Sequence, residues 1–303
     1  MQKWRFQSEA PFLYAAGHTS WGSRIMSGDT PIDLDAYFNR IGYSGSHAPT
    51  LETLKALHYA HALSIPFENL DVLAKRPILL DPVSLQKKLV TDRRGGYCFE
   101  VNALFAAVLR QLGFDLTTLI GRVRWMSPEE VDTARSHMLM RVELPEGPFL
   151  ADVGFGGLTM TGPIRFETGI EQETPHEPRR LIDHEDGLEL QAKIGGEWVP
   201  VYRFTMEPHR RTDYEVASWY TSTHPSSIFV QFLIAGRPQE DKWLSLLNRD
   251  FKIRGLDGKA VTRRLDSADE IAEVLDSYFG ISLSEDDKAV MLAPYMDAWR
   301  AMP

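Results

Sequence analysis

The stretch Arg93-Arg94-Gly95-Gly96-Tyr97-Cys98-Phe99-Glu100 contains the single cysteine of this 303-residue chain. The Gly95-Gly96 pair predicts a sharp backbone turn, since neither residue carries a Cβ atom. The residues that follow, Phe99 to Leu112, have helical spacing and end at Gly113. We therefore expect Cys98 at the start of a helix, where unpaired backbone N–H groups and the helix dipole lower the pKa of a thiol.

Two interpretations of Cys98 are open at this point. Unpaired cysteines are often buried and pack as small apolar side chains. The turn and the helix start instead favour a reactive thiolate. Arg93 and Arg94 also allow two interpretations. Their charge could favour the thiolate, or one of them could form a buried structural ion pair with Glu68 or Glu100, which is the interpretation we prefer.

The composition is that of an ordinary globular protein, with 43% hydrophobic and 25% charged residues. The formal net charge of -9 provides no basic surface for nucleic acid or an anionic membrane. No apolar run reaches the ~18–20 residues of a transmembrane helix. A single cysteine excludes an intrachain disulfide and suits a reducing compartment, so we expect a cytoplasmic protein. We interpret residues 1–28 as an extension outside the fold, either non-native or disordered.

The hydrophobic pattern divides the chain into three parts. Residues 29–113 are predicted to be helical, with helices over residues 33–38, 50–58, 82–90 and 99–112 and Thr50 as a candidate N-cap. Residues 114–214 are predicted to form antiparallel strands, over residues 116–125, 138–144, 149–153, 188–194 and 198–204. Residues 215–303 mix helix and strand and end in helices over residues 266–279 and 285–302. The expected class is α+β.

A nucleophilic cysteine needs a base, and that base needs an orienting acceptor. His137 stands at the start of one alternating strand, and Asp152 lies near the end of the next. Counted from Glu146 in the intervening turn, His137 is nine residues back and Asp152 six residues forward, so both lie at the same end of the hairpin. Taken singly, each is more typical of a structural hydrogen-bond partner or a turn residue. The spacing nevertheless permits a Cys98–His137–Asp152 relay.

The run around Cys98, together with Ser136-His137 and Asp152-Val153-Gly154-Phe155-Gly156, resembles the signature of the arylamine N-acetyltransferases. Residues 33–43, 65–71 and 219–225 are also similar to segments of that family, so that the resemblance covers about residues 33–290. It implies a helical bundle over residues 29–113, a central antiparallel β-barrel over residues 114–214 and an α/β lid over residues 215–303. The core would be papain-like, with a cysteine on a helix facing a histidine on a sheet.

The resemblance also implies an activity. Cys98 would take an acetyl group from acetyl-CoA as a thioester, His137 would act as its base, and Asp152 would orient His137. Acetyl-CoA would be a co-substrate, no metal would be needed, and the acceptor would be an arylamine, arylhydrazine or N-arylhydroxylamine. The expected partners are these small molecules, without nucleic acid or a membrane, and a homodimer is left open.

Further binding residues follow from the resemblance alone. Phe67 and Phe155 would line the acceptor pocket, and the glycines Gly154 and Gly156 would let CoA or substrate approach the backbone. Trp125 would line the cleft that both substrates share. Tyr220 and Thr223 would lie in a loop of the third part, where Thr223 would contact CoA and Tyr220 would stack on its adenine or cap the acceptor site. Without the resemblance, Phe67 and Phe155 would be core residues and Trp125 a half-buried barrel aromatic.

Other interpretations stay open. His58 and His61 could form half of a metal site, but without a carboxylate or cysteine at ligand spacing we interpret them as surface or packing residues. A papain-like or transglutaminase-like hydrolase would also use a Cys-His-Asp relay, although no papain-type motif surrounds Cys98. An inactive acyl-CoA binder is the non-enzymatic alternative. The sequence names neither the acceptor amine nor the acyl group, so propionyl-CoA and malonyl-CoA remain candidate donors.

Overall fold

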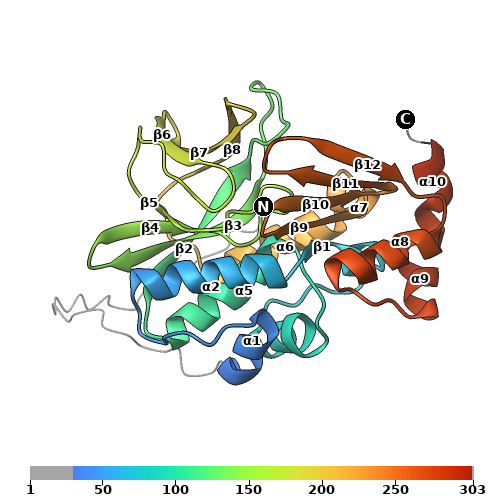
Figure 1. Cartoon of the computed structure of the whole chain (residues 1–303), viewed down its shortest axis with the longest axis horizontal. Coiled ribbons are helices and arrows are strands. Elements are labelled where there is room, and N and C mark those ends of the chain that lie inside the picture. The colour runs from blue at the N-terminus through green and yellow to red at the C-terminus, as the bar shows by residue number, and fades with distance from the viewer. Residues whose placement is uncertain (1–29, 302–303) are drawn as a thin grey trace, which may run out of the picture.

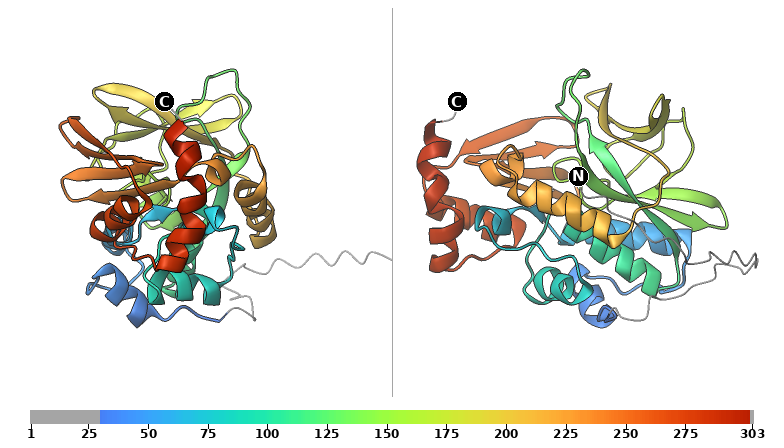
Figure 2. Two further views of the ribbon diagram at one scale, coloured as in Figure 1. Left: turned by 90° about the vertical axis from the view of Figure 1, so that its right-hand side faces the viewer. Right: turned by 180° about the vertical axis from the view of Figure 1, so that it is seen from behind.

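The computed structural model describes residues 30–301, so the interpretation of residues 1–28 as an extension lies outside the described residues. Two sheets lie above a layer of helices, and the C-terminal helices cover the end of the molecule away from the larger sheet (Figures 1 and 2). The α+β class is confirmed. Within the described residues, no helix is long and apolar enough to cross a membrane.

The first part of the chain is mostly helical, as predicted. Its elements are α1 (Leu34–Ile41), α2 (Leu51–Ser64), β1 (Phe67–Glu68), α3 (Leu70–Leu73), α4 (Pro82–Leu85), the π-helical turn η1 (Gln86–Thr91) and α5 (Cys98–Gln111). Thr50 caps α2, because its side chain accepts a hydrogen bond from the backbone N–H of Thr53. The helix predicted over residues 99–112 is confirmed as α5, which begins at Cys98.

The second part forms a seven-stranded antiparallel sheet in the order β5-β4-β3-β2-β8-β7-β6. The strands are β2 (Asp115–Val123), β3 (Arg135–Leu144), β4 (Gly147–Ala151), β5 (Ile164–Arg165), β6 (Arg179–His184), β7 (Gly187–Ile194) and β8 (Glu197–Phe204). A bridge between Thr168 and Leu181 joins the segment after β5 to β6, which nearly closes the sheet into a barrel. The five predicted strands are confirmed, whereas the sequence pattern missed β5 and β6.

The third part begins with α6 (Arg211–Thr223), so the predicted boundary between residues 214 and 215 falls inside a helix. Its other elements are α7 (Ile228–Gln231), β9 (Ile234–Gln239), β10 (Lys242–Leu247), β11 (Asp250–Gly255), β12 (Ala260–Arg264), α8 (Ala268–Val274), η2 (Leu275–Phe279), α9 (Glu285–Met291), η3 (Ala293–Tyr295) and α10 (Met296–Ala301). The second sheet has the order β1-β9-β10-β11-β12. β1 comes from the first part of the chain and pairs with β9 of the third part, so that Phe67 lies opposite Gly236 and Glu68 opposite Ala235.

The alternation along β3 decides which way its side chains point. Met138 and Met140 belong to the core that also contains Phe105 of α5, whereas Leu139 belongs to the separate core inside the barrel. Successive side chains of a strand point to opposite faces. His137 therefore lies on the same face of β3 as Leu139, toward the interior of the barrel.

Buried ion pairs hold the segment that precedes α5. Arg94 donates to Glu68 at 2.7 Å, and Lys88 contacts Glu100 at 2.7 Å and Asp71 at 2.8 Å. The preferred interpretation of the arginines is thus confirmed for Arg94, with Glu68 as its partner. Arg93 is exposed, and Lys88 rather than an arginine pairs with Glu100.

We predict that Arg94→Met lowers the free energy of unfolding by about 3–5 kcal/mol, because it leaves the carboxylate of Glu68 buried without the guanidinium that donates two hydrogen bonds to its Oε1. Urea denaturation followed by circular dichroism measures this change. Lys87→Met is the matched control, because Lys87 pairs with Asp92 at an exposed site of the preceding turn and should cost only about 0–1 kcal/mol. Equal losses in the two variants would contradict a structural role for the Arg94–Glu68 pair.

Candidate active site

Cys98 is the first residue of α5, as predicted, and it is only 3% exposed. Its Sγ lies 3.3 Å from the carbonyl oxygen of Ser136, at the start of β3. Neither Gly95 nor Gly96 has a positive φ. Gly95 is required for a different reason: a Cβ atom there would lie 2.2 Å from the carbonyl oxygen of Pro66.

His137 and Asp152 meet at the open end of the β3–β4 hairpin, as the residue count predicted. His137 Nε2 lies 2.7 Å from Asp152 Oδ2, and both side chains are buried. Since a carboxylate only accepts hydrogen bonds, Nε2 carries the hydrogen and Nδ1 is the nitrogen available to the Cys98 proton. The hairpin register, with Met140 opposite Ala151, places the two residues at this end.

The electrostatic environment favours an imidazolium at His137. Burial alone lowers its pKa, but the charge and hydrogen bond of Asp152, together with a hydrogen bond to Cys98, raise that pKa to about 10. Burial raises the pKa of Asp152, yet the His137 charge and several hydrogen bonds lower it below its ordinary value.

Asn102 was missed by the sequence analysis, although it lies one turn after Cys98 on α5. Its Nδ2 donates to the carbonyl oxygen of Met138 at 2.7 Å and to Asp152 Oδ1 at 2.9 Å. Its Oδ1 accepts from the backbone N–H of Val153 at 3.0 Å. This fully buried amide thus ties the cysteine helix to both strands of the hairpin. The sequence does hold a signal for Asn102, because a residue four positions after Cys98 lies on the same side of the predicted helix.

His58 and His61 are packing residues of α2, and the surface alternative is wrong because both are fully buried. His58 Nε2 accepts from the backbone N–H of Asp152 at 3.2 Å. Burial lowers the pKa of His58 to about 4, so it stays neutral beside the carboxylate. His61 Nδ1 instead contacts the hydroxyl of Tyr37 at 2.8 Å. No group of three metal-ligating side chains occurs among the described residues.

Of the two phenylalanines named from the resemblance, Phe155 lies beside His137. The ring of Phe155 is 5.1 Å from that of His137 and 5.7 Å from that of Tyr202. Phe67 is buried, and its ring is 6.0 Å from that of Phe229 in α7. Gly156 has φ +80 and packs against Phe67, since a Cβ there would be 3.3 Å from its ring.

Gly154 lies against α5, so its lack of a side chain has a packing reason. A Cβ atom at this position would lie 2.4 Å from Val101 and 2.9 Å from Asn102 on α5. The missing side chain therefore lets the barrel pack closely against the cysteine helix, and this space is filled by protein rather than by a substrate.

The other three residues named from the resemblance lie after β2 and on α6. Trp125 is half-buried in the turn after β2, where its backbone N–H donates to Val201. Tyr220 and Thr223 belong to the last turns of α6 rather than to a loop. The ring of Tyr220 stacks on that of His224 at 4.5 Å, and the Thr223 hydroxyl donates to the backbone of Trp219.

Comparisons with known proteins agree with this geometry. A family model described as N-acetyltransferase matches residues 50–288. An arylamine N-acetyltransferase of Mycolicibacterium smegmatis is 45% identical over 84% of this chain and 94% of its own length. A Salmonella typhimurium protein named arylamine N-acetyltransferase / N-hydroxyarylamine O-acetyltransferase is 37% identical over 83% of this chain and 90% of its own length.

A solved structure has the same fold. The arylamine N-acetyltransferase of Mycobacterium marinum, in complex with CoA, superposes with a TM-score of 0.84 at 40% identity, covering 88% of this chain and 99% of that one. The match of sequence and fold extends over most of both chains. The chain therefore belongs to the arylamine N-acetyltransferase family.

Proposed function

We propose that this protein transfers an acetyl group from acetyl-CoA to arylamines, arylhydrazines or N-arylhydroxylamines through a thioester on Cys98. The observation that carries the proposal is the buried His137–Asp152 pair beside the only thiol. The CoA complex of the M. marinum relative supports CoA as the donor's carrier. The lone thiol also fits a reducing compartment, and we propose the cytoplasm.

In the proposed resting state, the Cys98 proton already lies on His137 Nδ1, and in the first half-reaction the Cys98 thiolate attacks the carbonyl carbon of the acetyl group. The carbon–sulfur bond to CoA then breaks, and the CoA thiolate takes the proton from His137. Asp152 stabilises the imidazolium from the resting state until it gives up this proton. The products are acetylated Cys98 and free CoA, so the hard transfer is divided into two easier ones.

In the second half-reaction, the amine nitrogen attacks the thioester. An aromatic amine is weakly basic, so its lone pair is free at neutral pH. Its surplus proton passes to His137 as the Cys98 thiolate leaves, which restores the starting state. Phe155 supplies a flat apolar surface next to His137, where an aromatic acceptor would be held by ring contacts.

Asn102 and His58 are positioning residues in this proposal. Asn102 holds one oxygen of Asp152 so that the other faces His137. His58 binds the backbone of Asp152 without competing for its charge, since it is neutral. Both act on the reaction only through Asp152.

Incubation with acetyl-CoA and no amine should leave one acetyl group on Cys98, detected by mass spectrometry of the intact protein and its peptides. Addition of an arylamine such as 2-aminofluorene should remove it as the acetylated amine forms. Cys98→Ala should show neither step. An unmodified Cys98 thiol in wild-type protein incubated with acetyl-CoA would contradict the thioester mechanism.

Asp152→Asn should lower kcat by about 10⁴-fold, because the neutral amide no longer stabilises the imidazolium of His137. The same change should alter the alkylation of Cys98 by iodoacetamide. In the wild type, the raised pKa of His137 keeps the imidazolium beside the sulfur at neutral pH, so the rate should already be at its plateau there. In the variant, the rate should rise only near the ordinary thiol pKa of about 8.5. Identical profiles would show that Asp152 does not control the thiol.

Asn102→Leu should lower kcat by about tenfold to a hundredfold, in line with the ~1–3 kcal/mol cost of leaving a buried polar group unpaired. Asn69→Leu is the matched control. Asn69 is equally buried and its amide makes three hydrogen bonds to backbone groups, at Phe229, Phe232 and Ile234, away from the triad.

Both asparagine variants should lose stability in urea, but only Asn102→Leu should shift the pH profile of Cys98 alkylation. A shift of the same size in Asn69→Leu would reduce the role of Asn102 to general packing.

A further inference from the structure

A pocket of about 750 Å³ opens between α4, the second half of α5 and the start of α6, with β2 and β3 behind them. The view from behind in Figure 2 shows α6 running alongside α5 on this side of the molecule, where the rings of Phe99 and Tyr214 meet. Much of the pocket wall is small or aliphatic: Leu80, Leu85, Ala103, Ala106, Ala107 and Met138. The size and the apolar wall are typical of a site for a small organic ligand.

This pocket is separate from the triad. Met138 lines it and follows His137 on β3. Successive side chains of a strand point to opposite faces, so the pocket lies on the face of β3 away from His137. Along α5, Ala107 lies about 14 Å beyond Cys98, at 1.5 Å per residue. A ligand held here would leave the position of the transferred acetyl group open.

Two buried polar atoms in the lining lack a partner among the described residues. Tyr214 is 4% exposed, and its hydroxyl makes no hydrogen bond there. The same holds for the buried Nδ1 atom of His209. The Thr118 hydroxyl, which also lines the pocket, donates to the carbonyl oxygen of His209 instead. Because buried polar groups are nearly always hydrogen-bonded, these atoms indicate a place for a polar ligand group.

The charge of the lining is positive. Arg110, Arg210 and Arg211 line the pocket, and Glu215 is the acid among its described lining residues. Glu215 pairs with Arg211 at 2.9 Å. Arg110 and Arg210 form no ion pair with any residue of the described part of the chain, and both are exposed. Their guanidinium groups can therefore donate to a ligand.

The N-terminus of α6 adds to this charge, because Arg210, Arg211 and Thr212 line the pocket. The first backbone N–H groups of a helix and its dipole favour an anion. Asp213, the acid of this first turn, accepts the backbone N–H of Arg210 and does not line the pocket. The helix terminus and the unpaired guanidinium groups thus favour the same ligand charge.

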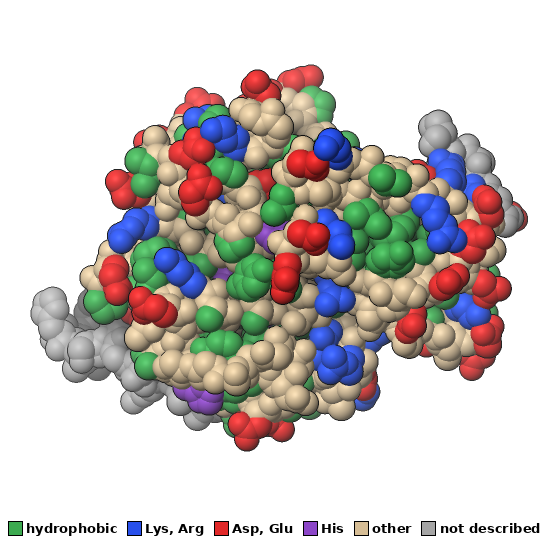
Figure 3. Space-filling model, in the orientation of Figure 1, with side chains coloured by type: hydrophobic (Ala, Val, Ile, Leu, Met, Phe, Trp, Pro, Cys, Tyr) green, Lys and Arg blue, Asp and Glu red, His purple; other side chains and the backbone are tan. Residues whose placement is uncertain are grey.

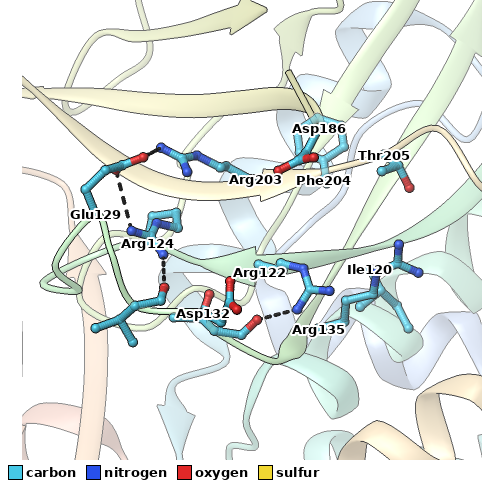
Figure 4. Close-up of a pocket in the computed structure, with 12 residues that line it drawn as sticks. Ile120, Arg122, Arg124, Glu129, Asp132, Arg135, Asp186, Arg203, Phe204 and Thr205 are labelled. Carbon is cyan, nitrogen blue, oxygen red and sulfur yellow. Dashed lines mark hydrogen bonds and ion pairs between the residues drawn. The ribbon is translucent and has the colours of Figure 1, made fainter. Parts of the chain in front are cut away.

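The cavity at the β2–β3 loop differs in this respect, because its arginines are matched by acids. There Arg203 pairs with Glu129 (Figure 4) and with Glu189, and Arg135 pairs with Glu207. On the face seen in Figure 3, basic and acidic side chains are intermixed. Since the whole chain carries a net charge of -9, an anion needs a local surplus of cations, which the pocket beside α5 provides.

We propose that the pocket beside α5 binds a medium-chain carboxylic acid, with its carboxylate beside Arg110 and the start of α6 and its alkyl chain along the alanines of α5. A carboxylate accepts hydrogen bonds from guanidinium, hydroxyl and backbone N–H groups, which the polar part of the lining offers. The aliphatic wall requires a ligand that is mostly apolar. The site does not depend on the proposed acetyl transfer.

The test measures the binding of octanoate by titration calorimetry, with 1-octanol as the uncharged probe. The wild-type protein should bind octanoate more tightly than octanol. Arg110→Gln should raise Kd for octanoate about tenfold and change Kd for octanol by less than about twofold, because only the carboxylate uses the guanidinium. Arg165→Gln is the matched control, because Arg165 is an exposed arginine outside the pocket that donates to the carbonyl oxygen of Glu146.

A second variant tests the apolar wall. Ala107→Trp should fill the pocket and weaken the binding of both probes by at least about tenfold. Ala56→Trp, at an exposed position of α2, is its control and should change neither. Urea denaturation of each variant establishes that the fold is retained, and if Ala107→Trp does not fold, Arg110→Gln decides.

Four results would each overturn the proposal: no binding of octanoate, an equal effect of Arg110→Gln on both probes, equal effects of Arg110→Gln and Arg165→Gln, or unchanged binding in folded Ala107→Trp. Loss of binding after alkylation of Cys98 by iodoacetamide would place octanoate at the triad instead. A dimer that Ala107→Trp dissociates would identify a second copy of the chain as the occupant and would also contradict the proposal.

Discussion

The burial of the Asp152 carboxylate is the constraint on which the rest of this structure depends. A buried carboxylate is costly unless it is paired and hydrogen-bonded on all sides. Here His137, Asn102 and the backbone N–H of Gly154 bind its oxygens, and His58 binds its backbone. These partners come from α2, α5, β3 and the segment after β4. Satisfying one carboxylate therefore fixes the helical part of the chain against the barrel.

The same constraint explains the close packing around Cys98. Gly154 has no side chain, which lets the barrel approach α5 closely enough for Asn102 to reach Asp152. Arg94 and Glu68 hold the segment before α5, and Gly95 lets that segment pass against the backbone of Pro66. Cys98 is thus buried beside His137, and the proposed thioester chemistry requires a thiol that is both buried and reactive.

Much of the candidate site could be predicted, because its central contacts are local or follow from strand pairing. The numbers of residues that separate His137 and Asp152 from the intervening turn predicted that both lie at the same end of a hairpin. The strand register and their hydrogen bond confirm this prediction. The helix start at Cys98 followed from hydrophobic spacing. The sequence predicted an arginine ion pair with either Glu68 or Glu100. The structure shows that Arg94 pairs with Glu68.

The remaining residues depend on contacts between distant segments. His58 and Asp152 are 94 positions apart, and no spacing rule joins α2 to the end of β4. Gly154 was expected to let a ligand approach the backbone, because the sequence does not show that α5 packs against this residue. The short strands β1 and β5 lack enough residues for a recognisable alternation.

The central claim is that the Asp152 charge holds His137 as an imidazolium beside Cys98. Nitrogen NMR of the protein labelled at its histidines tests this directly, with His137→Gln used to assign the signal. The account predicts that both ring nitrogens of His137 carry hydrogen at pH 7 and that Nδ1 loses it only near pH 10. A neutral His137 ring at pH 7 in the resting wild-type protein would contradict it.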